Sequence, residues 1–329
     1  MEDIITIIGG SGFVGTNLCK SLRNKGILFE IIDLKVSKTF PKETKIADVR
    51  DLKLLSLAIT GNIIINLAAI HRDDVKDKTT YYTTNVIGAK NIIAVSKQKN
   101  IKKIIFTSSV AVYGFVTSET NEDGEISPFN EYGKTKFEAE KLFRVWNNET
   151  KNSLIIIRPT VIFGEGNRGN VFNLFNQIYN NRFIMIGNGK NKKSIAYIAN
   201  VVAFIEKCLT ENIDFGLYNY VDGPNINMNK FIKLIRRVIK NKKNIGIRLP
   251  YWLGLFIGYI FDFTSFIFNK KFSISSIRVK KFCSSSEFTS AKNNLEDFVA
   301  PFSLEDGIFK TLSYEFVDNN PNKEVFFTE

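Results

Sequence analysis

The sequence predicts an α/β fold, a doubly wound parallel sheet with a smaller C-terminal lobe, and three observations support this prediction. First, the N-terminal half alternates short apolar runs with segments of helical periodicity, which is the pattern of consecutive βαβ units. Second, the apolar runs are nearly continuous in Ile, Val, Leu and Phe, as expected for strands that helices cover on both faces. Third, a glycine-rich turn joins the first run to the first helical segment, as in doubly wound folds that bind a ligand there.

The predicted elements define two parts of the chain. The strands span residues 4–8, 28–33, 62–67, 103–107 and 154–158, and the long helices span 12–24, 80–98 and 130–147. After Pro159 the sequence becomes irregular and richer in Asn and Gly, which indicates insertions that build a second lobe. We therefore predict a first domain at residues 1–165, to which a strand and a helix near 194–222 return, and a lobe formed by residues 166–193 and 223–329.

Composition and charge narrow the class of protein. Of the 329 residues, 44% are hydrophobic and 24% are charged, as in ordinary folded proteins. The net charge of +12 favours anionic partners, but no nucleic-acid-binding motif accompanies the lysines, so we predict no nucleic-acid partner. Three widely spaced cysteines predict reduced thiols and neither a disulfide nor a metal site. The acidic start of the chain differs from a secretory signal, so we expect a cytoplasmic protein.

A strongly apolar and aromatic segment, residues 249–268, lies in the C-terminal part. Its length approaches the roughly 20 residues of a membrane-spanning helix, but Asp262 and two glycines count against spanning. Lys270 and Lys271 follow the segment. Two interpretations stay open: a buried helix or subunit contact, or an amphipathic helix that lies in the membrane surface, with residues 249–271 facing lipid and headgroups.

The turn after the first strand has the spacing of a dinucleotide-binding motif. Gly9, Gly12 and Gly15 stand three residues apart in GGSGFVG, and a helical pattern follows at once. Such glycines let the backbone approach a pyrophosphate, whose charge then meets free N–H groups at the helix N-terminus. Asp33 ends the second strand, where a carboxylate accepts hydrogen bonds from ribose hydroxyls and repels a 2′-phosphate. The sequence therefore predicts NAD as cofactor, in preference to NADP.

Tyr132 and Lys136 form the predicted catalytic pair. They lie four residues apart in a predicted helix, so one turn separates them on the same face. A phenol ordinarily has a pKa near 10, but a neighbouring lysine and a positively charged nicotinamide ring both favour the phenolate. This pair alone is a common pattern, but FTSSVAVYG, residues 106–114, follows the fourth strand at the sheet edge where ligands bind. We expect a structural role for the lone histidine, His71.

Together these motifs resemble the UDP-galactose 4-epimerase branch of the extended short-chain dehydrogenases/reductases, over nearly the whole chain. The resemblance implies a Rossmann-type domain that binds NAD, a substrate-binding lobe and a homodimer. It assigns the catalytic hydroxyl to Ser109, with Ser108 as the alternative, beside Tyr132 and Lys136. It also implies that the cofactor contacts a further set of residues, namely Phe13, Val14, Asp48, Val49, Leu67, Ala68, Ala69, Asn85 and Pro159.

Longer sequence segments narrow the resemblance to one subgroup. HRDDV at residues 71–75 and SSIRVKKFC at 275–283 are similar to 4-epimerases that act on N-acetylglucosamine (GlcNAc) linked through a diphosphate to undecaprenol. This resemblance implies interconversion of GlcNAc and N-acetylgalactosamine (GalNAc) on the lipid carrier, through a 4-keto sugar, in the synthesis of surface polysaccharides such as O-antigen. It also implies substrate contacts at Arg72, Ser109, Asn170, Lys193 and Arg278.

Other functions stay open at this point. A 4-epimerase of free UDP-GlcNAc or UDP-glucose would use the same catalytic residues, whereas a non-catalytic NAD-binding protein would keep the glycines but need no Tyr–Lys pair. A 4,6-dehydratase is disfavoured, because Val110 and Ala111 follow Ser109 where that class carries an acidic pair. The chain also departs from many relatives in two positions: it has Asn200 in place of Asp and Lys193 in place of Arg. Arg binds phosphate through two parallel hydrogen bonds, so phosphate recognition is expected to be weaker with Lys193.

Overall fold

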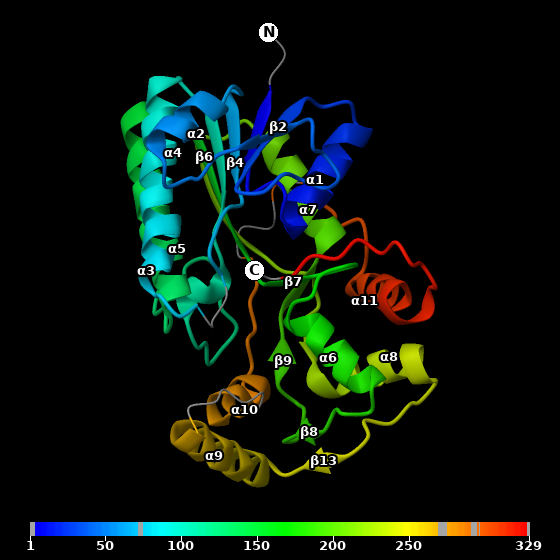
Figure 1. The fold of residues 1–329 in the computed structure, drawn as a ribbon. Helices are drawn as coiled ribbons and strands as arrows, with labels where there is room; N and C mark the ends of the chain where they lie inside the picture. The colour runs from blue at the N-terminus through cyan, green and yellow to red at the C-terminus, as the bar shows by residue number, and fades with distance from the viewer. Residues whose placement is uncertain (1–3, 72–74, 269–274, 291–294, 296, 328–329) are drawn as a thin grey trace.

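The computed structural model describes residues 4–71, 75–268, 275–290, 295 and 297–327. A seven-stranded sheet forms the larger domain, and a second lobe lies beyond the carboxyl ends of its strands (Figure 1). All strand pairs in this sheet are parallel, in the order β11-β6-β5-β4-β1-β2-β3. The strands are β1 (Ile5–Ile8), β2 (Phe29–Asp33), β3 (Thr44–Ile46), β4 (Ile63–Asn66), β5 (Lys103–Thr107), β6 (Ser153–Pro159) and β11 (Phe215–Tyr220).

Helices cover both faces of the sheet, as a doubly wound fold requires. Helices α1 and α7 lie on one face, and α2, α4 and α5 lie on the other (Figure 1). Their bounds are α1 (Phe13–Asn24), α2 (Leu52–Ala58), α3 (Thr79–Tyr81), α4 (Gly88–Gln98), α5 (Glu131–Thr150) and α7 (Ile198–Thr210). A π-helical segment, Tyr82–Ile87, joins α3 to α4, and a 3-10 turn, Val110–Tyr113, follows β5.

Alternate residues of each strand pack into separate cores on the two faces. Ile7, Ile31 and Ile105 belong to the core beneath α1 and α7, whereas their neighbours Ile32 and Ile104 belong to the core beneath α2, α4 and α5. The side-chain period of a strand is two residues, so a strand buried on both faces needs apolar residues at every position. This explains the unbroken apolar runs in the sequence.

The five predicted strands and the three predicted helical segments are confirmed, with the strand ends within one residue. The structure adds α2 and the edge strand β3 to the prediction, and the strand expected to return near residues 194–222 is the other edge strand, β11. Both edge strands have weak sequence signals: β3 is three half-exposed or exposed residues, and β11 contains Gly216 and Asn219. The predicted helix at 80–98 is also interrupted by the π-helical segment, which widens one turn.

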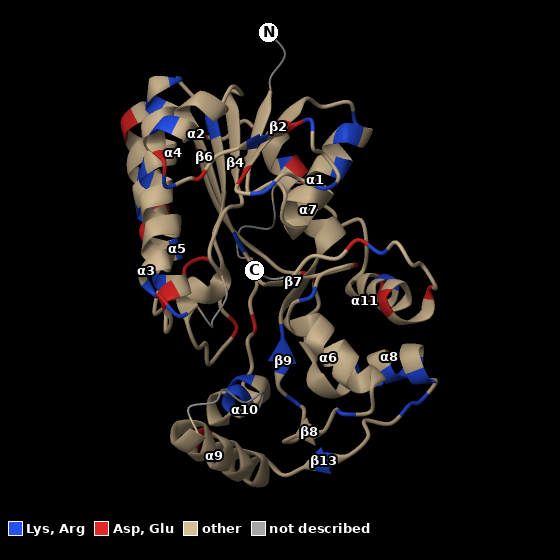
Figure 2. Ribbon diagram, viewed as in Figure 1, with Lys and Arg blue, Asp and Glu red and all other residues tan. Residues whose placement is uncertain are grey.

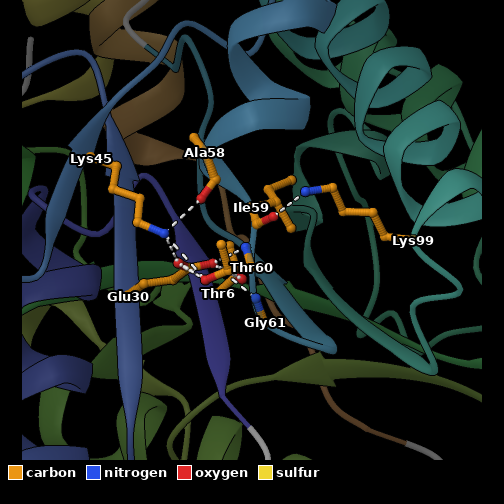
Figure 3. Close-up of polar contacts among 8 residues, drawn as sticks. All are labelled: Thr6, Glu30, Lys45, Ala58, Ile59, Thr60, Gly61 and Lys99. Atoms are coloured by element: carbon orange, nitrogen blue, oxygen red, sulfur yellow. Dashed lines mark hydrogen bonds and ion pairs between the residues drawn. The ribbon is translucent and has the colours of Figure 1, made fainter.

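A buried carboxylate, Glu30, joins several elements near the amino-terminal edge of the sheet (Figure 3). Glu30 accepts hydrogen bonds from the hydroxyls of Thr6 and Thr60, each at 2.6 Å, from the backbone N–H of Gly61 at 3.0 Å and from Lys45 at 2.5 Å. Burial raises the pKa of Glu30, but these hydrogen bonds outweigh it and the net shift is downward. The cluster ties β1, β2, β3 and the loop before β4 to one another and supports the sheet from the end opposite the glycine turn.

The second lobe consists of short strands and helices. It contains three two-stranded ribbons, β7 with β10, β9 with β12 and β8 with β13. Its strands are β7 (Val161–Phe163), β8 (Met185–Ile186), β9 (Lys192–Lys193), β10 (Ile195–Tyr197), β12 (Ile226–Asn227) and β13 (Arg248–Leu249). Its helices are α6 (Asn170–Tyr179), α8 (Met228–Lys240), α9 (Tyr251–Phe268), α10 (Ser276–Cys283) and α11 (Leu304–Leu312), the last followed by a π-helical turn, Ser313–Val317.

Candidate active site

The glycine turn lies where the strand order of the sheet reverses. β1 stands between β4 and β2, and ligands of doubly wound sheets bind at this switch point, beyond the carboxyl ends of the strands. A Cβ on Gly9 would lie 2.7 Å from the backbone nitrogen of Ala68 after β4, and Gly9 has a φ of +81°. Both facts require glycine there. Among the described residues, a Cβ on Gly12 would meet only the Gly9 carbonyl, at 3.5 Å, which leaves room for a ligand beside this part of the turn.

The start of α1 offers backbone donors to that ligand. Gly12 is the N-cap residue, and no side chain within the described ranges caps the helix. The first N–H groups of a helix have no partner inside it, and the helix dipole adds partial positive charge there. These groups, which include the predicted residues Phe13, Val14 and Gly15, therefore fit the pyrophosphate of a dinucleotide.

Two acidic residues lie along the adenosine side of the predicted cofactor site. Asp33 accepts hydrogen bonds from the backbone N–H of Ser11 at 3.0 Å and of Lys35 at 3.3 Å, which fixes its carboxylate beside the glycine turn. The side-chain hydrogen bonds of Arg50 lower the pKa of Asp48. Val49 is buried against Gly88. This arrangement fits a ribose at Asp33 and an adenine near Asp48, although the individual contacts stay predictions.

Helix α5 carries the predicted catalytic pair. The side chain of Asn130 caps the helix by accepting a hydrogen bond from the N–H of Gly133 at 2.9 Å, and Tyr132 follows in the first turn. Lys136 is 2% exposed, and its Nζ lies 4.3 Å from the centre of the Phe106 ring. Burial lowers the pKa of Lys136 from its usual 10.5 to about 7, and the Glu140 carboxylate opposes this shift. The lysine therefore changes charge within the pH range in which a phenol must be activated.

Two neighbouring serines differ in what their hydroxyls contact, and the difference favours Ser109 as the catalytic hydroxyl. Ser108 is buried and donates to Glu140 at 2.5 Å. Ser109 is half-buried, and its oxygen accepts a hydrogen bond from the N–H of Ala111 at 3.1 Å. A Cβ on Gly133 would lie 2.4 Å from the Ala111 carbonyl, so the serine segment packs directly against the start of α5. Tyr132 and Ser109 thus come from two elements in close contact.

A buried polar network that the sequence analysis missed supports this site from below. Arg158, at the end of β6, donates to both carboxylate oxygens of Glu140 at 2.9 and 2.6 Å, and to the hydroxyl of Tyr113 at 2.6 Å. Tyr113 in turn donates to Asn219 of β11 at 2.8 Å. All of these residues are buried. The one sequence signal for this network was the position of Glu140, an acidic residue one helical turn beyond Lys136 on the same helix face.

The nicotinamide side of the predicted site is lined by small and apolar residues. Leu67, Ala68 and Ala69 follow β4 and are half-buried, and Pro159 is buried at the end of β6. The hydroxyls of Thr107 and Thr160, at the ends of the neighbouring strands β5 and β6, are buried, and neither has a partner within the described part of the chain. Buried hydroxyls are normally paired, so these two are exceptions within the described residues, and the predicted contact of Pro159 with the cofactor stays a prediction.

Asn85 holds the loop after β4 in place, and its predicted contact with the cofactor stays a prediction. It accepts a hydrogen bond from the N–H of Ile70 at 3.0 Å and donates to the Ile70 carbonyl at 3.2 Å and to Thr135 of α5 at 3.0 Å. The π-helical segment places this amide in the interior, where it is 5% exposed. Asn85 thereby ties the loop after β4 to the helix that carries Tyr132.

The predicted substrate residues lie around the second lobe. Arg72 falls outside the described residues. Asn170 is exposed in the first turn of α6, and Arg278 is exposed on α10. Lys193 donates to the carbonyls of Lys281 at 2.8 Å and Ser284 at 2.7 Å, at the end of α10. Burial lowers the pKa of Lys193 to about 8. Its ammonium therefore anchors α10, and its predicted contact with phosphate would use the remaining donor.

The departure at Asn200 also has a structural reason. Asn200 is fully buried, donates to the Phe302 carbonyl at 2.9 Å and accepts from the Phe302 N–H at 3.0 Å. An aspartate cannot donate, so this pair of hydrogen bonds requires the amide. The asparagine thus positions the segment before α11, away from the catalytic helix.

Comparison with known proteins places the chain. Over 334 residues, covering 100% of both chains, it is 45% identical to the N-acetyl-alpha-D-glucosaminyl-diphospho-ditrans,octacis-undecaprenol 4-epimerase of Escherichia coli O157:H7. Its fold resembles UDP-N-acetylglucosamine 4-epimerase from Bacillus cereus, with a TM-score of 0.75, 18% identity and coverage of 94% and 98%. The fold also resembles UDP-glucuronic acid 4-epimerase from the same organism, in complex with NAD, with a TM-score of 0.72 and 19% identity. That match covers 94% of this chain and 98% of the other.

The family assignment rests on both the match to a family and this full-length relative. Residues 5–219 match the NAD dependent epimerase/dehydratase family, and that range includes the glycine turn, Asp33, Ser109, Tyr132 and Lys136. The chain therefore belongs to the NAD-dependent epimerase/dehydratase family of extended short-chain dehydrogenases/reductases.

Proposed function

We propose that the protein is an NAD-dependent 4-epimerase that interconverts GlcNAc-diphospho-undecaprenol and GalNAc-diphospho-undecaprenol in surface polysaccharide synthesis. The observation that carries this proposal is the 45% identity over the full length of an enzyme named for that substrate. The close contact between the serine segment and the start of α5 supports it. The alternative substrate is a free nucleotide sugar, since structural neighbours include UDP-sugar 4-epimerases.

The chain's own residues account for the proton transfers of this reaction. Tyr132 takes the proton from the C4 hydroxyl of the sugar, and Ser109 hydrogen-bonds the same oxygen as it becomes a carbonyl. Lys136, one turn away, favours the phenolate of Tyr132 when protonated. NAD, when bound, supplies a reversible hydride acceptor for C4. The keto sugar turns about its diphosphate linkage and presents its other face, after which Tyr132 returns the proton and C4 has the inverted configuration.

The substrate can be tested directly. Purified protein is incubated with GlcNAc-diphospho-undecaprenol in detergent and, separately, with UDP-GlcNAc, and the released sugars are separated after mild acid hydrolysis. We expect GalNAc to form from the lipid-linked substrate. Turnover of UDP-GlcNAc alone would refute the proposal in favour of a nucleotide-sugar epimerase.

A second test separates an enzyme from a non-catalytic NAD-binding protein. Tyr132→Phe removes the proton acceptor but keeps the ring, so we expect NAD binding to persist and turnover to fall by about a thousandfold or more. NAD content is measured by absorbance after heat release, and turnover by GalNAc formation. Retained turnover in this variant would remove Tyr132 from the mechanism.

A peripheral contact with the membrane through α9 is part of the proposal. Among the described residues, α9 is the one helix long and apolar enough to cross a membrane by length and composition, and only 11% of its most apolar stretch is buried. Trp252, Phe256 and Phe266 are 68%, 59% and 86% exposed. The structure therefore contradicts the interpretation of residues 249–268 as a helix buried within the chain, and leaves lipid or another subunit as its cover.

The packing of α9 favours a position in the plane of the membrane surface over a spanning one. Its buried side contains Gly254 and Gly258, which lie against Ile186 and the start of α10. Asp262 accepts a hydrogen bond from the N–H of Ser276 at 3.1 Å. Helix α9 contains no Lys or Arg, whereas α10, which packs against it, and β13, which precedes it, carry basic residues (Figure 2). An apolar face beside basic groups is the pattern of an interfacial helix on anionic lipid.

Liposome flotation tests the membrane contact. The wild-type protein is expected to float with vesicles that contain anionic lipid, and the Trp252→Ser/Phe256→Ser variant is expected to remain in the dense fraction. Phe309→Ser is the matched control, because Phe309 is 56% exposed on α11, outside the proposed surface. If the wild type does not float, the proposed membrane contact is wrong. A smaller mass for the Trp252→Ser/Phe256→Ser variant than for the wild type, measured by size-exclusion chromatography with light scattering, would then assign α9 to a subunit contact.

The cellular location and the oligomeric state follow as further parts of the proposal. The enzyme would work at the cytoplasmic face of the membrane as a homodimer, with α5 and its neighbouring helix at the interface. Light scattering in detergent tests the dimer, and a single-chain mass would exclude it.

A further inference from the structure

A cavity of about 660 Å³ lies between α9 and the loop that follows the catalytic serine. Its lining includes Phe115, Gly187, Tyr251, Ile277 and Lys280. Sites of about 300–1,000 Å³ accommodate ligands of moderate size. The cavity is therefore large enough to be part of a substrate site, and it was not among the sites predicted from the sequence.

The two ends of the cavity belong to different parts of the molecule. Phe115 directly follows Gly114, which closes the 3-10 turn that Ser109 begins. Its ring packs on that of Phe129, with centroids 4.6 Å apart, and Phe129 lies just before the Asn130 cap of α5. At the other end, Tyr251 is the first residue of α9. The cavity thus extends from the elements that carry the catalytic residues to the exposed apolar helix.

The lining combines apolar surface with positive charge. Ile277 and Tyr251 are 48% and 43% exposed, so they continue the exposed apolar surface of α9 into the cavity. Lys280 lies on the same helix as Ile277, and its Nζ is 5.7 Å from the ring of Tyr259 in α9. A molecule that is anionic at one point and apolar immediately beside it matches this order of groups.

We propose that this cavity binds the part of the substrate where the diphosphate joins the lipid, with Lys280 at the diphosphate and Phe115, Tyr251 and Ile277 around the first isoprene unit. This inference rests on the proposed function and deepens it. The lipid then leaves the cavity along α9 at the membrane surface, while the sugar reaches Tyr132. Specificity for a lipid carrier comes from this apolar lining.

Water-soluble substrates test the inference without detergent. We would measure kcat and KM for GlcNAc diphosphate esterified with a methyl group and with a single dimethylallyl group, the smallest prenyl tail. In the wild type, burial of the isoprene unit is expected to lower KM about tenfold relative to the methyl ester. Ile277→Ser is expected to abolish this difference with little change in kcat. Ile277 is half-exposed, so this substitution leaves the fold intact.

Two further variants complete the design. Ile247→Ser is the matched control, because Ile247 is 68% exposed in the same lobe and does not line the cavity; it is expected to keep the tenfold difference. Lys280→Gln is expected to raise KM for both esters equally, because both carry the diphosphate.

The outcomes separate this inference from the proposed function. Equal KM values for the two esters in the wild type, or a difference that survives Ile277→Ser, would overturn the inference even if GlcNAc-diphospho-undecaprenol is turned over. A raised KM for UDP-GlcNAc in Ile277→Ser would overturn it as well and assign the cavity to a nucleoside. Absence of turnover with every diphospholipid substrate would instead refute the proposed function.

Discussion

Replacing Lys136 with Met should raise the free energy of unfolding of the protein and should also remove its activity. Burial holds the pKa of Lys136 at about 7, against 10.5 for an ordinary lysine. One pKa unit corresponds to about 1.4 kcal/mol, so keeping the ammonium buried lowers the free energy of unfolding by about 5 kcal/mol. Met is similar in length and carries no charge, so Lys136→Met removes this cost. In the proposed mechanism, the protonated lysine favours the phenolate of Tyr132, so the variant should be inactive.

The stability difference between Lys136→Met and the wild type should grow as the pH falls. Above about pH 10.5 the lysine is neutral in both the folded and the unfolded chain, so the variant gains nothing. As the pH falls from there toward about 7, only the unfolded chain takes up the proton, and wild-type stability falls relative to the variant. The expected difference is about 2 kcal/mol near pH 9 and reaches about 4–5 kcal/mol near pH 6–7, below which it levels off.

Urea unfolding of NAD-free protein, followed by circular dichroism at several pH values, measures this difference. Comparing variant with wild type at each pH cancels the titration of all other groups. Lys134→Met is the control, because Lys134 is exposed on the same helix and pairs with Glu131 at 2.8 Å; its effect should stay below about 0.5–1 kcal/mol. A Lys136→Met variant that is less stable than wild type near pH 7, or a difference that does not change with pH, would refute the reasoning.

Three further predictions concern single side chains. Ser109→Ala should lower kcat about a hundredfold with little loss of stability, whereas Ser108→Ala should cost about 1–2 kcal/mol by removing a donor from buried Glu140; kinetics and urea unfolding of both variants decide, and the reverse pattern would make Ser108 the catalytic hydroxyl. Lys103→Met should lower the free energy of unfolding by about 2 kcal/mol or more, because Nζ donates to three carbonyls at the end of α7; an unchanged urea midpoint would contradict this. Asp33→Asn should reduce the preference for NADH over NADPH about tenfold in fluorescence titration, and an unchanged ratio would show that Asp33 does not face the ribose.

The agreement between sequence and structure is best where a feature is local. The glycine spacing, the Tyr132–Lys136 interval and the strand runs each depend on residues close in the chain, and their geometry follows from the fixed periods of helix and strand. The edge strand β11 was located only as a return of the chain near 194–222, because its pairing with β6 joins residues about sixty positions apart. No local pattern carries that pairing.

The supporting contacts of the site could not be predicted for the same reason. Glu140 meets Arg158 and Ser108 from three different elements, and Asn85 reaches Thr135 across fifty residues. Sequence alone left Ser108 and Ser109 as alternatives, since adjacent residues in an extended segment point to opposite sides and only the packing decides which hydroxyl is buried. Ser108 donates to the buried Glu140, whereas Ser109 is half-buried and its oxygen accepts from the N–H of Ala111.

By itself, the sequence determined the parallel α/β fold and the position of the dinucleotide motif, and it predicted the Tyr132–Lys136 pair, because local spacing and apolar patterns encode these features. Only the tertiary structure decided that residues 249–268 form an exposed helix. The segment is apolar on every side, and such a segment is compatible with a core, a subunit contact or a membrane surface. Which of these it contacts depends on what the rest of the chain packs against it, and within the described residues only Gly254 and Gly258 of this helix are buried.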